Sequence, residues 1–100
     1  MAKLILEIPH TLSKDAALNK IKTLLPNLRT EYSDLISDLE ENWIGYEGNF
    51  KFKIKGYKVS GIVTFKDKSI LIDGDIPFSA LLFKGKIEQT IISEARKILN

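Results

Sequence analysis

The sequence contains no cysteine among its 100 residues, and it has only one tryptophan, one methionine and one histidine. The absence of cysteine excludes disulfides, thiol catalysis and cysteine-ligated zinc or iron–sulfur sites. No apolar run approaches the ~20 residues of a membrane-spanning helix, and the apolar part of the N-terminal MAKLILEIPH is too short for a signal peptide. The sequence therefore predicts a soluble, cytoplasmic protein without a membrane span.

The length predicts a single domain over residues 1–100 with one hydrophobic core. The net charge is only +2, but the charges are segregated along the chain. Residues 30–50 hold six acids and no base, whereas residues 51–68 hold six lysines and one acid. This segregation indicates that an acidic segment lies beside a basic one.

The stretch from residue 49 to residue 74 has the clearest structural pattern. Apolar and polar residues alternate in it with the period of two that is typical of strands with one exposed face. A tight turn at residues 55–56 places Phe50 opposite Gly61, and a second turn at residues 66–69 places Phe65 opposite Ile70. All three strands then keep their apolar side chains on one face, which requires an apolar cover.

The remaining elements supply that cover. Residues 3–8 alternate as an N-terminal strand, and Thr11 or Ser13 can cap a following helix in which Pro26 predicts a kink or a restart. The segment Asp73-Gly74-Asp75 predicts a turn that ends the last strand. A C-terminal helix then carries an apolar stripe at spacings of three and four, made of Ala80, Phe83, Ile87, Ile91, Ala95 and Ile98.

Residues 34–44 fit either a helix or a strand, because their apolar residues satisfy both a spacing of four and a period of two. Charge favours the strand. If residues 45–48 form a turn, Glu40 faces Lys53 on the outer side and Trp43 faces Phe50 on the inner side. Glu41 then points inward and must lie near the rim of the sheet. The predicted fold is α+β in the order β-α-β-β-β-β-α, a twisted antiparallel sheet with a long C-terminal helix on one face.

Residues capable of catalysis or metal binding are few and isolated. His10 lies between a strand and a capped helix, where a loop or capping role is expected. Asp73 and Asp75 lack the further oxygen ligands of a calcium loop, and adjacent Glu40 and Glu41 point to opposite faces of a strand. No glycine-rich phosphate loop is present. We therefore predict no catalytic residues, no metal, no cofactor and no enzymatic activity.

The lysines of residues 51–68 raise the hypothesis of nucleic-acid binding. Phe50 and Phe52 lie on the face opposite these lysines, whereas a base-stacking platform needs aromatic and basic groups together. Nucleic acid is therefore not the predicted partner. Apolar residues nearest to strand ends and loops instead mark a candidate contact patch or ligand mouth, and these are Trp43, Tyr46, Tyr57, Phe78 and Phe83.

Several segments also resemble the small bacterial polyhydroxyalkanoic acid system proteins: GNFKFKIKGYKVSGIVTF, ILIDGDIPF and FKGKIEQTI, after a strand that ends at His10. The resemblance implies association with polyhydroxyalkanoate, the carbon-storage polyester, through a granule or a granule-bound protein, and it supplies no catalytic residues. The element order is also similar to a shortened helix-grip lipid-binding domain. Two functions stay open: a non-catalytic accessory protein of polyester storage, and a binder of a small acyl or hydroxyacyl ligand between sheet and C-terminal helix.

Overall fold

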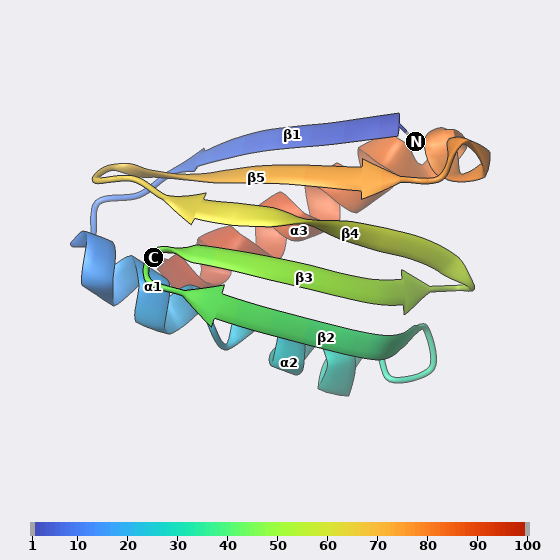
Figure 1. Cartoon of the computed structure of the whole chain (residues 1–100), viewed down its shortest axis with the longest axis horizontal. Coiled ribbons are helices and arrows are strands. Elements are labelled where there is room, and N and C mark those ends of the chain that lie inside the picture. Colours follow the sequence, from blue (N-terminus) through green and yellow to red (C-terminus); the bar gives the residue numbers. More distant parts are fainter. Residues whose placement is uncertain (1, 100) are drawn as a thin grey trace.

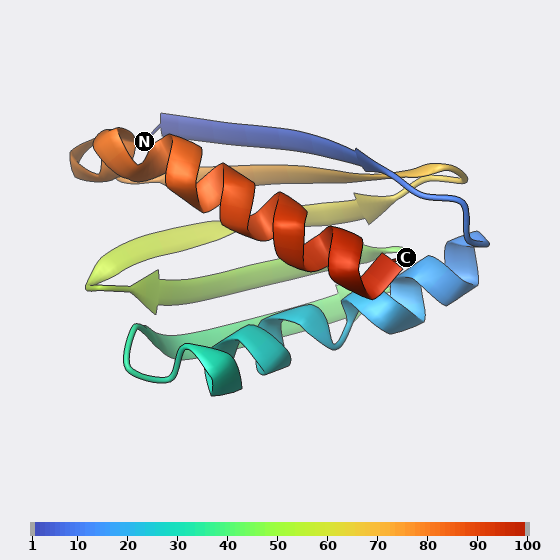
Figure 2. The same cartoon turned by 180° about the vertical axis from the view of Figure 1, so that it is seen from behind.

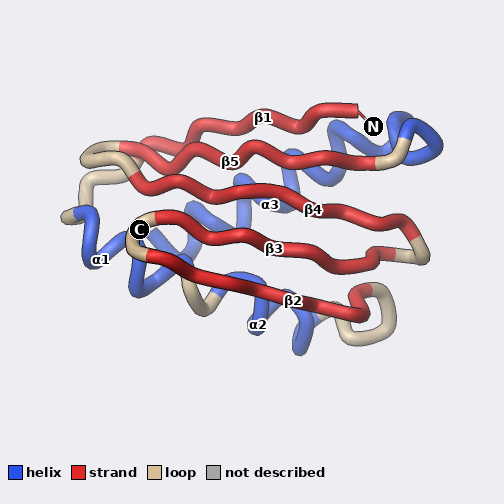
Figure 3. The backbone as a smooth tube through the Cα atoms, in the orientation of Figure 1, coloured by secondary structure: helices blue, strands red, loops and turns tan. Residues whose placement is uncertain are grey.

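The computed structural model describes residues 2–99 as one antiparallel sheet with helices on a single face (Figures 1 and 3). The strand order is β1-β5-β4-β3-β2, so β1 and β2 form the two edges. The predicted α+β class, with a long C-terminal helix against the sheet, is confirmed. The elements are β1 (Ala2–Pro9), α1 (Lys14–Ile21), α2 (Leu24–Glu31), β2 (Ile36–Ile44), β3 (Glu47–Ile54), β4 (Tyr57–Phe65), β5 (Ser69–Ile76), the 3-10 helix η1 (Phe78–Phe83) and α3 (Lys84–Leu99).

The helices cover the inner face of the sheet and leave the outer face bare (Figure 2). Helix α3 crosses the inner face diagonally, while α1 and α2 follow one another along the side of β2. The core lies between these layers, because one set of alternating apolar residues in each strand points inward. Its fully buried members include Ile8, Ile70 and Ile76.

The predicted pairing of the three central strands is confirmed. Phe50 lies opposite Gly61, and Phe65 lies opposite Ile70. The turn between β3 and β4 consists of Lys55 and Gly56, both with positive φ (+51° and +83°), as the favoured two-residue hairpin requires. The ring of Phe50 covers Gly61, since its Cζ lies only 2.9 Å from where a Cβ on that glycine would stand.

Strand β2 forms as predicted, but the predicted pairing of its residues is wrong. The turn between β2 and β3 contains only Gly45 and Tyr46. Gly45 adopts a φ of +58°, and Gly48 already belongs to β3. Trp43 therefore lies opposite Gly48 instead of Phe50, and Glu40 lies opposite Lys51 instead of Lys53. The shift of two residues leaves the side chains of residues 40–44 on their predicted faces, whereas before residue 40 it is Ile36 that lies opposite Ile54 and is buried. Opposite charges still meet because β3 carries lysines at positions 51 and 53 and the following turn carries another at position 55.

The acidic residue predicted to point inward does so, at the edge of the sheet. Glu41 lies opposite Phe50 on the inner side of β2 and is half-buried, and its Oε1 accepts a hydrogen bond from Trp43 Nε1 at 3.4 Å. A bulge between residues 37 and 40, where Asp38 has a φ of +54°, shifts the pairing once more. It places Asp38 Oδ2 3.3 Å from Lys53 Nζ.

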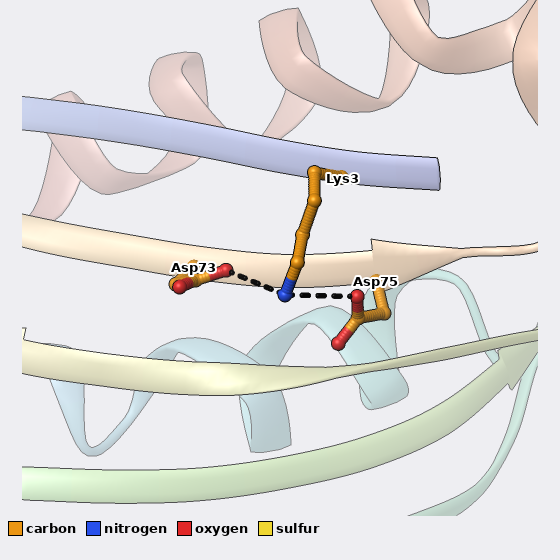
Figure 4. A network of polar contacts seen from close by, with 3 residues as sticks. All are labelled: Lys3, Asp73 and Asp75. Atoms are coloured by element: carbon orange, nitrogen blue, oxygen red, sulfur yellow. Dashed lines mark hydrogen bonds and ion pairs between the residues drawn. The ribbon is translucent and has the colours of Figure 1, made fainter. Parts of the chain in front are cut away.

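The segment Asp73-Gly74-Asp75 is not a turn, contrary to the sequence prediction. It lies inside β5, where Gly74 is buried and pairs with Leu4 on one side and Gly61 on the other. Both aspartates project to the outer face, and Lys3 Nζ lies between them, 3.3 Å from Asp73 and 3.1 Å from Asp75 (Figure 4). Hydrogen bonds to Asp75 and Asp73 raise the pKa of Lys3, since both carboxylates favour the charged ammonium.

The helices begin and restart where the sequence predicts. Ser13 caps α1 by accepting a hydrogen bond from the Ala16 amide at 3.1 Å. Pro26 lies in the first turn of α2, a position that tolerates its missing amide proton, and the chain is interrupted just before it. At the C-terminal end, η1 precedes the regular helix, which starts beside Gly85. Within residues 2–99, no helix is long and apolar enough to cross a membrane.

Candidate functional site

Four exposed apolar side chains gather on η1, among them Leu82, the most exposed large apolar side chain of residues 2–99. Leu82 is 94% exposed, Phe78 67%, Phe83 50% and Leu81 47%, whereas Ala80 alone in this helix is buried. Ala80 packs on the core, while its neighbours in η1 point outward. We call Phe78, Leu81, Leu82 and Phe83 the apolar tip. Exposed apolar groups gathered in this way are typical of a contact surface.

The apolar tip lies at the end of the sheet where β5 ends and β4 begins (Figure 1). Tyr57, the first residue of β4, packs against it, with its ring centroid 6.1 Å from that of Phe83. The structure therefore brings together three of the five candidate residues predicted from the sequence, namely Tyr57, Phe78 and Phe83. Two lysines, Lys84 and Lys86, follow the tip in the first turn of α3.

The other two candidates, Trp43 and Tyr46, lie at the opposite end of the sheet, where β2 turns into β3 (Figure 1). Trp43 is half-buried: its ring covers Gly48 and its centroid lies 6.0 Å from that of Phe65. Its geometry is that of a packing residue of the core.

Tyr46 contacts helix α1 from this second end of the sheet. Its hydroxyl donates a hydrogen bond of 2.5 Å to Asp15 Oδ1, and Lys14 Nζ lies 4.3 Å from the centre of its ring. The hydrogen bond to Asp15 raises the pKa of Tyr46, because ionised tyrosine would lose the bond and face a second negative charge. The five candidates thus form two separate groups.

The sequence prediction did not single out Leu81 and Leu82, the remaining members of the apolar tip. A signal was present. Both leucines fall between Ala80 and Phe83, outside the apolar stripe that continues to Ile87, and they are followed by lysines. Apolar residues on the side of a helix that should be wet are the feature that would have identified them.

The outer face of the sheet is charged, and most of its lysines have partners. Besides the contacts of Lys3 with Asp73 and Asp75, Lys66 lies 3.4 Å from Glu7 and Lys53 lies 3.3 Å from Asp38. Phe50 and Phe52 stack on the inner face, away from these lysines, as predicted. Across residues 2–99, no three His, Asp or Glu side chains are grouped so that they could hold a metal ion.

Two apolar spaces open between the sheet and the helices. The first is enclosed by residues of α1, α2, α3 and the inner face, including Trp43 and Phe52, and holds about 60 Å³. The second is a groove of about 270 Å³ between α2 and α3, and it reaches the surface at the β3–β4 turn. Lys55 and Lys86 line this groove together with apolar side chains.

His10 lies in the loop after β1, as predicted, and its amide donates to the Lys68 carbonyl at 2.9 Å. The side chain is buried, and neither ring nitrogen has a hydrogen-bond partner among residues 2–99. A buried polar atom without a partner costs about 1–3 kcal/mol.

We therefore expect His10→Leu to keep the free energy of unfolding unchanged or to raise it by about 1 kcal/mol, because it removes both unpaired nitrogens. Chemical denaturation checks this value. His10→Gln, which retains polar atoms at the site, is the control and should be less stable than His10→Leu. A loss above about 1 kcal/mol in His10→Leu would mean that the imidazole has a favourable partner.

Together, these features define a small two-layer α+β protein with a bare charged sheet face and an apolar tip at one end. A protein-family model described as "Putative polyhydroxyalkanoic acid system protein" matches residues 5–99. The chain therefore belongs to the polyhydroxyalkanoic acid system protein family, as its sequence resemblance predicted. No match was found among curated proteins or among solved structures.

Proposed function

We propose that this protein is a non-catalytic, cytoplasmic accessory protein of polyhydroxyalkanoate storage that docks on the polyester granule, or on a granule-bound protein, through its apolar tip. Family membership supports the connection to the polyester. The exposure of Leu82, at 94%, is the observation that supports the mode of docking. An apolar side chain that finds no cover within its own chain gains about 1.5–3 kcal/mol when a partner surface buries it.

The charged outer face is a weaker candidate for docking. Lys3, Lys53 and Lys66 already lie beside carboxylates of the same chain, so their charge is partly neutralised. Replacing such contacts by contacts to a partner yields little net energy at an exposed surface. The tip has no competing partner of this kind, because Leu82 is almost fully exposed.

The sedimentation of isolated granules tests the proposal. Wild-type protein should pellet with granules at both low and high salt, since apolar docking does not weaken as counterions are released. The variant Leu81→Ser/Leu82→Ser should lose docking by more than about tenfold, because each leucine contributes about 1.5–3 kcal/mol when buried. Its stability should change little, since both side chains are exposed.

A matched control is Ile5→Ser/Ile44→Ser, which removes two apolar side chains, 61% and 70% exposed, from the outer face. This variant should sediment like the wild type, with circular dichroism verifying both folds. Wild-type protein that stays in the supernatant, or a tip variant that pellets equally well, contradicts the proposal. Docking that weakens steeply with salt would mean that the lysines, and not the apolar tip, contact the granule. Sedimentation with polyester particles that carry no protein identifies the partner. Binding to these particles indicates the polymer, and binding to isolated granules alone indicates a granule-bound protein.

The alternative function, the binding of a small acyl or hydroxyacyl ligand between the sheet and the C-terminal helix, gains little support from the enclosed space. The volume of this space is only about 60 Å³. Pockets for small molecules usually measure ~300 Å³ or more. In this enclosed space an acyl chain would have to displace residues of the core, so we rank granule docking above ligand binding there.

A further inference from the structure

The groove between α2 and α3 is a second apolar surface, separate from the tip and from the enclosed core space. The two helices cover the same face of the sheet, but they diverge toward the β3–β4 turn and leave strands visible between them (Figure 2). Helix α3 lines the groove with Ile87 and Ile91, and α2 lines it with Leu28. The other apolar or aromatic lining residues are Tyr32, Leu35, Ile36, Phe52, Ile54 and Val59.

Two lysines give this groove a charge. Lys55 belongs to the β3–β4 turn and Lys86 to the first turn of α3, and both are exposed. Neither forms an ion pair with any of the residues 2–99, unlike Lys3, Lys53, Lys66 and Lys97. No carboxylate lines the groove. The groove is therefore apolar along its walls and positive at its lysines, a combination that is complementary to an anion with an apolar chain.

We propose that this groove binds a free medium-chain alkanoic acid, with the alkyl chain along the apolar walls and the carboxylate beside Lys55 and Lys86. The volume of about 270 Å³ lies near the lower end of small-molecule pockets, ~300 Å³, which suits a chain of about six to ten carbons. This site does not depend on granule docking, because it uses none of the four tip residues.

The affinity should follow the length of the chain. Each buried methylene tightens binding about fourfold, so affinity should rise in steps from butanoate through hexanoate to octanoate. The gain should end near ten carbons, because the groove is then filled. The carboxylate contributes separately, and removing both lysines should weaken octanoate about tenfold, as expected for two exposed charge contacts.

Titration of the full chain with octanoate, followed by methyl NMR, tests the site. The methyl groups of Ile87, Ile91 and Val59 should shift, while those of Ile5 and Ile62 on the outer face should not. In Lys55→Ala/Lys86→Ala, octanoate should bind about tenfold more weakly, and 1-octanol should bind as it does to the wild type. The control Lys51→Ala/Lys58→Ala removes the same charge from other exposed positions and should leave both ligands unaffected.

The proposal is overturned if millimolar octanoate shifts no groove methyl, if the outer-face methyls shift equally, or if the Lys55/Lys86 variant retains wild-type affinity for octanoate. These outcomes are distinct from a failure of granule docking. The Leu81→Ser/Leu82→Ser variant should still bind octanoate, and the Lys55→Ala/Lys86→Ala variant should still pellet with granules. Each variant thus tests one surface only.

Discussion

Replacing Ile70 with alanine is expected to lower the free energy of unfolding by about 2–5 kcal/mol. Ile70 lies at the start of β5, pairs with Ile8 and Phe65, and is fully buried between the sheet and the helices. The truncation removes its transfer energy and leaves a cavity that the surrounding strands cannot close. Because small domains are stable by only about 5–15 kcal/mol, this single change should remove a large part of the total.

Urea denaturation of Ile70→Ala beside Ile44→Ala measures the effect. Ile44 lies on the outer face of β2 and is 70% exposed, so the same substitution should change stability there by less than about 0.5 kcal/mol. The pair compares one residue type on the covered and the bare side of the sheet. Equal losses in the two variants would contradict the arrangement in which helices cover one face only.

The central sheet could be predicted because its sequence combines alternation with compact turns. The pairing of β3 with β4 follows from a two-residue turn at Lys55-Gly56. Both residues of this turn have a positive φ, as this type of hairpin requires. The β2–β3 hairpin lacked such a constraint. Lysines occupy positions 51, 53 and 55, so a shift of two residues exchanges one favourable charge pair for another. Alternation of charge alone could not reveal the shorter turn at Gly45.

The segment Asp73-Gly74-Asp75 shows a different limit of prediction. Its residue types favour a turn, and nothing nearby in the sequence argues against one. The strand is stabilised instead by β1, whose Lys3 lies between the two carboxylates although it is 70 residues from Asp73 in the sequence. Pairing between distant segments overrides a local preference of this kind.

The candidate site could be predicted only in part. Phe78, Phe83 and Tyr57 were identified because they lie at strand ends, and they do gather at one end of the molecule. Strand directions would have separated Trp43 and Tyr46 from them: β2 and β5 run in opposite directions, so their C-terminal ends lie at opposite ends of the sheet. Leu81 and Leu82 lie outside the apolar stripe, and in η1 only Ala80 is buried.

A glycine-to-alanine substitution at position 61 is expected to destabilise the fold by about 1–3 kcal/mol, the usual cost of overpacking a core. A Cβ at this position would stand 2.6 Å from the Asp73 carbonyl oxygen, 2.8 Å from Gly74 Cα and 2.9 Å from Phe50 Cζ. The first two are backbone atoms of the neighbouring strand β5, so β4 and β5 would have to separate at this point.

The control is Gly85→Ala in the first turn of α3, where no atom lies within 4 Å of the added methyl group. This substitution should stabilise the protein by about 0.5–1 kcal/mol, because alanine loses less conformational freedom in a helix than glycine does. Thermal and chemical denaturation should therefore show opposite signs for the two variants. If Gly61→Ala were neutral, the close packing of β4 against β5 would be wrong. If adding Phe50→Leu to the Gly61→Ala variant fully restored its stability, the added methyl group would clash with the ring of Phe50 and not with the backbone of β5.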